Sequence, residues 1–307
     1  MTTTEVLNDL FFIERGYLNA NHLVFRSDNP ILIDTGYIAD FKDTALLIDS
    51  LGVNLQDTQL IVTTHCHCDH IGGNHAIQKM SGCDIIQHEL GKHFIETRND
   101  RATWWGYFNQ AAEFFTPTGS LQDGQNLSIG PHRFEVIYTP GHAADGIVLY
   151  NREAKLLISS DALWEYDMAV HTVRIEGSAA VYNTKKSLQH LSQLDVETVC
   201  PGHGRLFTDF KGALDRAQKR IQRFLDEPER VGDDLLKKIM VYTLLMKHKV
   251  RVDEFFSLLL EAVWFRETVD YYFKGKYKDK YRETLEALCD KGVVENRDHC
   301  HYTTVRP

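Results

Sequence analysis

The hexapeptide at residues 65–70, His-Cys-His-Cys-Asp-His, places three imidazoles and a carboxylate on six consecutive positions. It follows Leu60–Thr64, a short stretch rich in β-branched residues that predicts a buried strand. Side chains in a loop at a strand end can converge, and imidazole nitrogen and carboxylate oxygen are donors that zinc accepts. Gly72 and Gly73 permit a tight turn after the loop, and a helix is expected near residues 74–80. The chain must therefore fold around a polar site at the end of this strand.

Three later segments have the same construction, in which a strand-like run ends in a sharp turn that carries a possible ligand. His142 follows the strand expected at 134–138, Asp161 follows 155–159, and His203 follows 196–199. Four such turns are improbable as independent accidents. The pattern predicts that these side chains and those of the hexapeptide meet at one place.

These motifs resemble those of the metallo-β-lactamase-fold hydrolases over roughly residues 10–210. Residues 64–73 match the family's HxHxDH signature with its following glycines, and Ile33–Gly36 matches its first turn. The resemblance implies an α/β (α+β) protein, a four-layer αββα sandwich of two sheets with helices outside. It places His65, His67 and His142 on one metal. It places Asp69, His70 and His203 on a second metal, with Asp161 bridging the two and Asp34 supporting the ligands without being one.

Two divalent metal ions are therefore expected, zinc first, although iron and manganese accept the same donors. Two ions lower the pKa of a shared water from about 15.7 toward 7, so metal-bound hydroxide is the expected nucleophile. The sequence contains no Gly-x-Ser-x-Gly nucleophile elbow. Asp69 is the candidate catalytic residue, because it could orient the hydroxide or carry a proton. Cys66 and Cys68 alternate with the histidines and are expected to point away from the metals.

The expected activity is metal-dependent hydrolysis of a small ester, thioester or lactone. Two alternatives of the same fold remain: a phosphodiesterase or endoribonuclease, and a mononuclear iron enzyme similar to the persulfide dioxygenases, which use only part of this ligand set. His142 is followed by Ala143, where glyoxalase-II-type relatives usually carry threonine. The aromatic-rich segment 104–115 is interpreted as a substrate wall, a packed helix or a dimer contact, and residues 163–167 as pocket lining or packing.

Charge is unevenly distributed along the 307 residues, whose net charge is −9. Residues 1–210 contain 14 basic and 26 acidic side chains, a net of −12, and residues 211–307 contain 20 and 17, a net of +3. This balance favours a small-molecule substrate over a nucleic-acid partner. No signal-peptide pattern and no stretch of 18 apolar residues occurs, so no membrane association is expected. The six cysteines show no disulfide framework, which indicates free thiols in a cytoplasmic protein.

The periodicity of apolar residues predicts a boundary near residue 210. Residues 1–210 are expected to form the catalytic domain and residues 211–307 a mainly helical domain. In the second domain we expect helices at 209–225, 233–248, 252–264 and 278–290, then a hairpin of 293–296 with 301–305. This order resembles the winged-helix unit appended to some members of the fold. The lysine-rich run 274–278 is expected to be a solvated loop, and a homodimer is possible.

Overall fold

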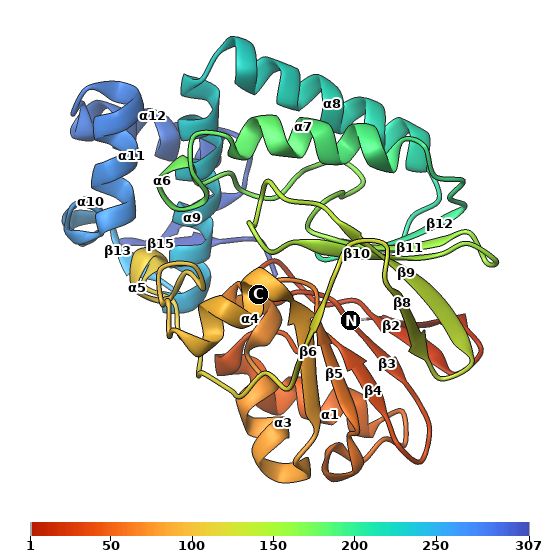
Figure 1. The fold of residues 1–307 in the computed structure, drawn as a ribbon. Helices are drawn as coiled ribbons and strands as arrows, with labels where there is room; N and C mark the ends of the chain where they lie inside the picture. Colours follow the sequence, from red (N-terminus) through yellow and green to blue (C-terminus); the bar gives the residue numbers. More distant parts are fainter. Residues whose placement is uncertain (1, 307) are drawn as a thin grey trace.

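Two β-sheets lie at the centre of the computed structural model, which describes residues 2–306 (Figure 1). The first sheet is antiparallel from β1 to β4 and parallel from β4 to β7. Its strands are β1 (Thr3–Leu7), β2 (Leu10–Ile13), β3 (His22–Phe25), β4 (Ile31–Ile33), β5 (Leu60–Thr63), β6 (Asp84–His88) and β7 (Gly119–Leu121).

The second sheet has the order β12-β11-β10-β9-β8 and is antiparallel except for the parallel pair β11 and β12. Its strands are β8 (Asn126–Ile129), β9 (His132–Tyr138), β10 (Ile147–Asn151), β11 (Leu156–Ser160) and β12 (Thr198–Pro201). Alternation along β9 sends Val136 into the space between the sheets and Ile137 toward the outer helices. Both faces of the second sheet are therefore covered.

Helices cover the outer face of each sheet (Figure 1). Helices α1 (Phe41–Asp49), α3 (Asn74–Ser81) and α4 (Glu89–Glu96) share an apolar cluster with the first sheet. Helices α7 (Ala180–Leu191) and α8 (Phe210–Asp226) share one with the second. The predicted four-layer αββα sandwich is confirmed.

The last part of the chain adds four helices and a small sheet of order β13-β15-β14. Its elements are α9 (Glu229–Lys247), β13 (Val250–Arg251), α10 (Val252–Glu261), α11 (Val263–Phe273), α12 (Tyr277–Asp290), β14 (Val294–Arg297) and β15 (Cys300–Thr303). One apolar cluster joins these helices to Tyr37, Cys68 and Trp104 of the sandwich. The predicted hairpin is present, whereas the boundary near 210 and the winged-helix likeness stay predictions.

Several expected elements differ from the structure. The helix expected at 252–264 is two helices, because Ala262 has extended backbone angles (φ −74°, ψ 129°), and Trp264 therefore belongs to α11. Strands β1, β6, β7 and β8 were not expected, and the strand expected at 196–199 lies at Thr198–Pro201. Within residues 2–306, no helix combines the length and hydropathy that crossing a bilayer requires.

Candidate metal centre

The predicted ligands stand at strand ends of both sheets. His65 and His67 follow β5 in a loop, and the one-turn helix α2 (Cys68–Ile71) carries Asp69 and His70. The second sheet contributes the other three, each just beyond a strand: His142 after β9, Asp161 after β11 and His203 after β12. All seven side chains are buried. The structure thus brings together every residue that the sequence proposed for the metals.

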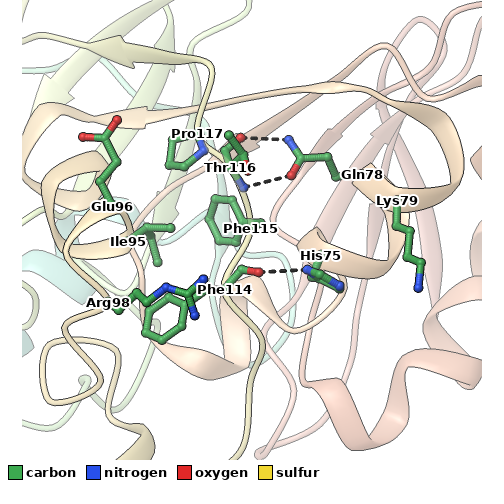
Figure 2. Close-up of a pocket in the computed structure, with 10 residues that line it drawn as sticks. All are labelled: His75, Gln78, Lys79, Ile95, Glu96, Arg98, Phe114, Phe115, Thr116 and Pro117. Carbon is green, nitrogen blue, oxygen red and sulfur yellow. Dashed lines mark hydrogen bonds between the residues drawn. The ribbon is translucent and has the colours of Figure 1, made fainter.

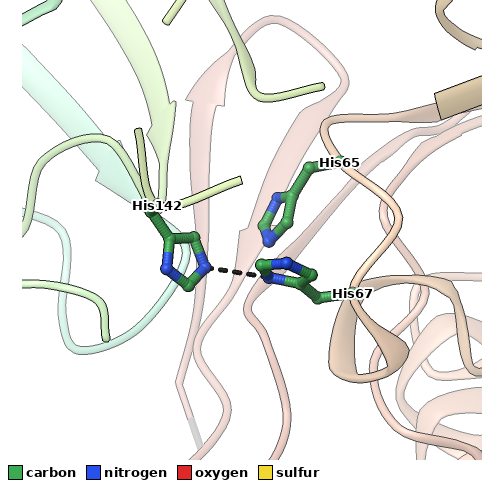
Figure 3. Close-up of side chains that lie close together, drawn as sticks. All are labelled: His65, His67 and His142. Carbon is green, nitrogen blue, oxygen red and sulfur yellow. Dashed lines mark hydrogen bonds between the residues drawn. The ribbon is translucent and has the colours of Figure 1, made fainter. Parts of the chain in front are cut away.

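Their donor atoms form three overlapping groups, and within each group the atoms lie within 4.8 Å of one another. The groups are His65, His67 and His142; His65, His70 and Asp161; and Asp69, His70 and His203. Figure 3 shows the three imidazoles of the first group converging, with His67 Nδ1 3.0 Å from His142 Nε2.

Asp161 lies between the outer groups. Its Oδ2 is 3.2 Å from His142 Nε2 and 3.5 Å from His70 Nε2. On the far side, His203 Nε2 is 3.3 Å from Asp69 Oδ2. The Asp161 carboxylate therefore lies between His142 of the first donor group and His70 of the third.

The residues fit metal ions, because their buried imidazoles have nitrogens with no other partner. The Nε2 atoms of His65, His70 and His203 accept and donate no hydrogen bond in the structure. Burying such a group unpaired is costly unless something else binds it. Burial, together with the neighbouring imidazoles, lowers the pKa of His65 and of His67 well below its usual value. These side chains are therefore held in the neutral form that binds metals.

Hydrogen bonds on the opposite ring nitrogens orient the imidazoles. His70 Nδ1 donates to Asp34 Oδ2 (2.8 Å), and Asp34 also accepts from the backbone N (2.8 Å) and Oγ1 (2.7 Å) of Thr64. His142 Nδ1 donates to the carbonyl oxygen of Val170 (2.6 Å). Such bonds leave Nε2 free as the donor toward a metal. Asp34 is thus a support and not a member of the three groups, as predicted.

Sequence reasoning missed Glu176. It ends the short helix α6 (Val173–Glu176), and its Oε1 lies 3.5 Å from His67 Nε2. Burial, and then the charge of Asp145, raise the pKa of Glu176 well above its usual value. No motif or spacing in the sequence marks this residue. Glu176 approaches Nε2 of His67, whereas His142 approaches Nδ1 of the same ring.

The aromatic segment 104–115 divides between two places. Trp104 stacks on the His67 ring with 3.8 Å between centroids, so it packs against a candidate ligand. Phe114 and Phe115 instead line a cavity of about 490 Å³ beside α3 and α4, together with residues such as His75 and Gln78 (Figure 2). None of the seven candidate ligands lines that cavity. The segment is therefore not a single substrate wall.

A cavity adjoins the metal centre at His203. A cavity of about 230 Å³ there is lined by Tyr17, Trp164, Glu165, Tyr166, Asp167, His203, Gly204 and Arg205. Trp164 Nε1 donates to Asp161 Oδ1 (3.1 Å), and the Trp164 ring centroid is 5.0 Å from that of His203. Of the segment 163–167, residues 164–167 therefore line a pocket, whereas Leu163 packs in the apolar cluster of the second sheet.

The cysteines lie outside the centre. The Sγ atoms of Cys66 and Cys68 point toward Ala102 O and Gln110 Oε1, and neither residue joins a metal group. All six cysteines are free thiols. Burial raises the pKa of both Cys66 and Cys68, which disfavours the thiolate that a metal would bind.

Comparison with known proteins gives a consistent family. The model of the metallo-beta-lactamase superfamily matches residues 19–203. A hydroxyacylglutathione hydrolase of Rhizobium johnstonii is 32% identical over 218 residues, which are 68% of this chain and 76% of that protein. The acyl-coenzyme A thioesterase MBLAC2 of Gallus gallus is 26% identical over 223 residues, 64% of this chain and 78% of that protein.

The fold is likewise shared with solved structures. A metallo-beta-lactamase family protein from Thermus thermophilus superposes with a TM-score of 0.63 and 20% identity, covering 97% of this chain and 100% of that one. The family match covers the strand-end loops that carry all seven candidate ligands. The chain therefore belongs to the metallo-beta-lactamase superfamily and is a metal-dependent hydrolase.

Proposed function

We propose that this protein is a dinuclear hydrolase of small thioesters. The observation that carries the proposal is the set of seven buried donors in overlapping groups joined by Asp161. The names of two relatives, a hydroxyacylglutathione hydrolase and an acyl-coenzyme A thioesterase, support a thioester as the substrate. Esters and lactones present the same acyl carbon and belong to the same proposed class.

The ligands would divide as the sequence predicts. His65, His67 and His142 would hold one ion and Asp69, His70 and His203 the other, with Asp161 between them. Two divalent ions, zinc first, would lower the pKa of a shared water from about 15.7 toward 7 and polarise the acyl oxygen.

The remaining chemistry belongs to the side chains of this chain. Asp69 Oδ2, 3.3 Å from His203 Nε2, would orient the attacking water and carry its proton to the departing thiolate. Asp34 fixes the orientation of His70, and Trp104 fixes that of His67. The seven ligands are buried, and a cavity of about 230 Å³ adjoins them at His203, where a substrate could enter.

Metal analysis and a substrate panel test the proposal. Protein purified without chelator should contain close to two transition-metal equivalents, and a thioester should give the highest kcat/KM among thioesters, esters, lactones and phosphodiesters. A single equivalent that added zinc, manganese or iron does not increase would contradict the dinuclear centre and favour a mononuclear iron enzyme. A phosphodiester as the best substrate would favour the phosphodiesterase alternative.

A further inference from the structure

A stripe of cations runs along a partly exposed face of α8. Its members are Arg216, Lys219, Arg220 and Arg223, spaced i, i+3, i+4 and i+7, so they share one side of the helix. The adjoining side of the helix carries Ala213, Ala217 and Ile221 into the apolar cluster of the second sheet. Like charges at these spacings repel each other. A protein of net charge −9 therefore gathers four cations along one side of this helix.

The stripe is continuous with the opening of the metal centre. A cavity of about 250 Å³ is lined by the four cations of the stripe together with Tyr166, Asp167, Met168 and Ala217. Tyr166 and Asp167 also line the cavity at His203. The two cavities therefore adjoin at Tyr166 and Asp167, and together they are called the groove between His203 and the stripe on α8.

Part of the stripe is neutralised and part is not. Asp167 contacts Arg220 and lies 3.2 Å from Lys238 Nζ, so two cations surround this carboxylate. Arg216 is 3.0 Å from Asp209, and Lys219 Nζ is 2.6 Å from Asp215 Oδ2. Within residues 2–306, Arg223 has no carboxylate at ion-pair distance, and the same holds for Arg205 at the inner end of the groove. The groove keeps an unpaired positive charge at each end.

The walls change character along the groove. Near the metal centre they are aromatic, with Tyr17 and Trp164 facing His203. Glu165 lies in this inner part and disfavours an anion there. Farther out, Tyr166 is 67% exposed, and the Arg216 guanidinium lies 4.9 Å from its ring centroid. An exposed aromatic ring beside arginines is suited to stacking on a nucleobase.

We propose that this groove binds the thiol half of the thioester and that this half carries phosphate groups, as coenzyme A does. The inference rests on the proposed thioesterase function and names its substrate class. A neutral chain fits the inner aromatic part, and the phosphates reach α8, where Arg216 and Arg223 are about 10 Å apart along the helix. Arginine forms paired hydrogen bonds with phosphate oxygens. The peptide thiol glutathione offers only carboxylates and an ammonium group, so four cations over two turns match it poorly.

The first test compares two thioesters that share one acyl group. The thiol is coenzyme A in one and N-acetylcysteamine, which has no charge, in the other. In the Lys219→Ala/Arg223→Ala variant, the ratio of kcat/KM for the coenzyme A ester to that for the neutral ester should fall at least about tenfold. The control Lys42→Ala/Lys79→Ala removes two exposed cations from α1 and α3 and should leave the ratio unchanged. An unchanged ratio in the α8 variant overturns the inference, even if both esters are hydrolysed.

A binding measurement separates this inference from the proposed function. Desulfo-coenzyme A lacks the sulfur and cannot ligate a metal through a thiolate, so its affinity for the metal-loaded protein, compared between the parent and the α8 variant, reports the groove without turnover. Calorimetry should show binding that weakens at least about tenfold in the α8 variant and also weakens with added salt. Absence of binding overturns the phosphate site. Tighter binding of a single-stranded RNA oligonucleotide, lost in the same variant, also overturns it and supports a phosphodiester substrate.

Discussion

The strand-end loops of the metal centre bury polar atoms that have no hydrogen-bond partner, whereas the helices α9–α12 bury polar atoms that are paired. In the loops, the Nε2 atoms of His65, His70 and His203 are buried without a hydrogen-bond partner. In the helices, buried polar groups are paired: Lys238 Nζ contacts Asp234 (2.8 Å) and Thr268 Oγ1 donates to a carbonyl oxygen (2.6 Å). The loops therefore contain buried nitrogens that a ligand must satisfy. The buried polar atoms of Lys238 and Thr268 in the helices already have partners within the protein.

The helices are also richer in large buried apolar side chains. Leu236, Phe255, Trp264 and Phe265 are almost completely inaccessible to solvent. Their cluster extends to Trp104, which stacks on His67. The comparison indicates a division of roles in which the helices stabilise the wall of the centre and the loops supply its chemistry. Substitutions in the two regions should therefore affect different measurements.

The largest effect should follow Asp161→Asn. This change removes the charge of the carboxylate between the two donor groups, and the amide cannot bridge two cations as well. We expect kcat/KM to fall by at least about 10³-fold, or roughly 4 kcal/mol of transition-state stabilisation, with loss of bound metal. Elemental analysis and steady-state kinetics measure both quantities. Normal metal content with normal turnover would contradict the bridging role.

Trp264→Ala should instead lower stability. Its side chain is 1% exposed and packs against Phe108 and Phe265, so truncation should cost about 3–5 kcal/mol. Denaturant unfolding measures the change, and the folded variant should keep the metal stoichiometry of the parent. Val263→Ala, at the exposed neighbouring position, is the matched control. A loss of metal equal to that of Asp161→Asn in the folded variant would contradict the division of roles.

The same division explains which parts of the structure could be predicted. Ligand residues have a restricted chemistry and stand at strand ends, so His142, Asp161 and His203 were recognisable without any knowledge of packing. Glu176 was not recognisable, because a single glutamate contacts His67 only through the tertiary fold. The break at Ala262 was also missed, since its neighbours continue a helical apolar pattern and only the packing of α10 and α11 separates them.

The sandwich was predicted from the resemblance of the motifs to a known family, and strands such as β10 and β11 were recognisable because they are short, continuously apolar runs. The short strands β7 and β8 were missed, because runs of three or four residues with exposed positions carry too weak a periodic signal. The groove along α8 was missed for another reason. The spacing of Arg216, Lys219, Arg220 and Arg223 is visible in the sequence, but only the structure shows that this face adjoins the opening at His203.

A smaller effect is expected from Asp34→Asn. Asp34 has a left-handed backbone (φ 59°), which asparagine tolerates, so the substitution removes charge without strain. Loss of the ionic partner of His70 should weaken metal affinity about 10- to 100-fold. Competition with a chelator measures the affinity. Asp57→Asn, on an exposed turn, is the control and should have no effect.

His22 tests whether buried imidazoles outside the metal centre affect acid stability. Burial, and then the charge of Arg15, lower the pKa of His22 to about 3, and neither ring nitrogen has a hydrogen-bond partner. The unfolded chain binds a proton near pH 6.5, whereas the folded chain does not until about pH 3. The free energy of unfolding should therefore fall as the pH decreases through this window, by up to about 1.4 kcal/mol per pH unit from this residue. His22→Leu should reduce the change in the free energy of unfolding per pH unit by the contribution of one bound proton. His75→Ala, at a partly exposed site, is the control and should leave this pH dependence unchanged.

The smallest effect is expected from the lysines between α11 and the first turn of α12, where Lys278 is helical and not part of the expected loop. Lys274, Lys276 and Lys278 form no ion pair among residues 2–306, so replacing all three by alanine should change the free energy of unfolding by no more than about 0.5 kcal/mol. Thioester turnover should stay within about twofold. Lys280 differs, because its ammonium group contacts Asp233 (2.7 Å) and Glu283 (2.9 Å) and lies 4.1 Å from the Phe273 ring centroid.

Lys280→Ala should therefore cost about 1 kcal/mol through lost packing and cation–π contact, without changing kcat/KM. Chemical denaturation of the triple variant and of Lys280→Ala, side by side, measures the difference between a solvated lysine and a buried one on the same stretch of chain. If only Lys280→Ala lowers the free energy of unfolding and neither variant lowers kcat/KM, the helical region stabilises the fold without taking part in the reaction. A triple variant that lost thioester turnover while remaining folded would show that this basic stretch takes part in the reaction, and would place part of the chemistry outside the strand-end loops.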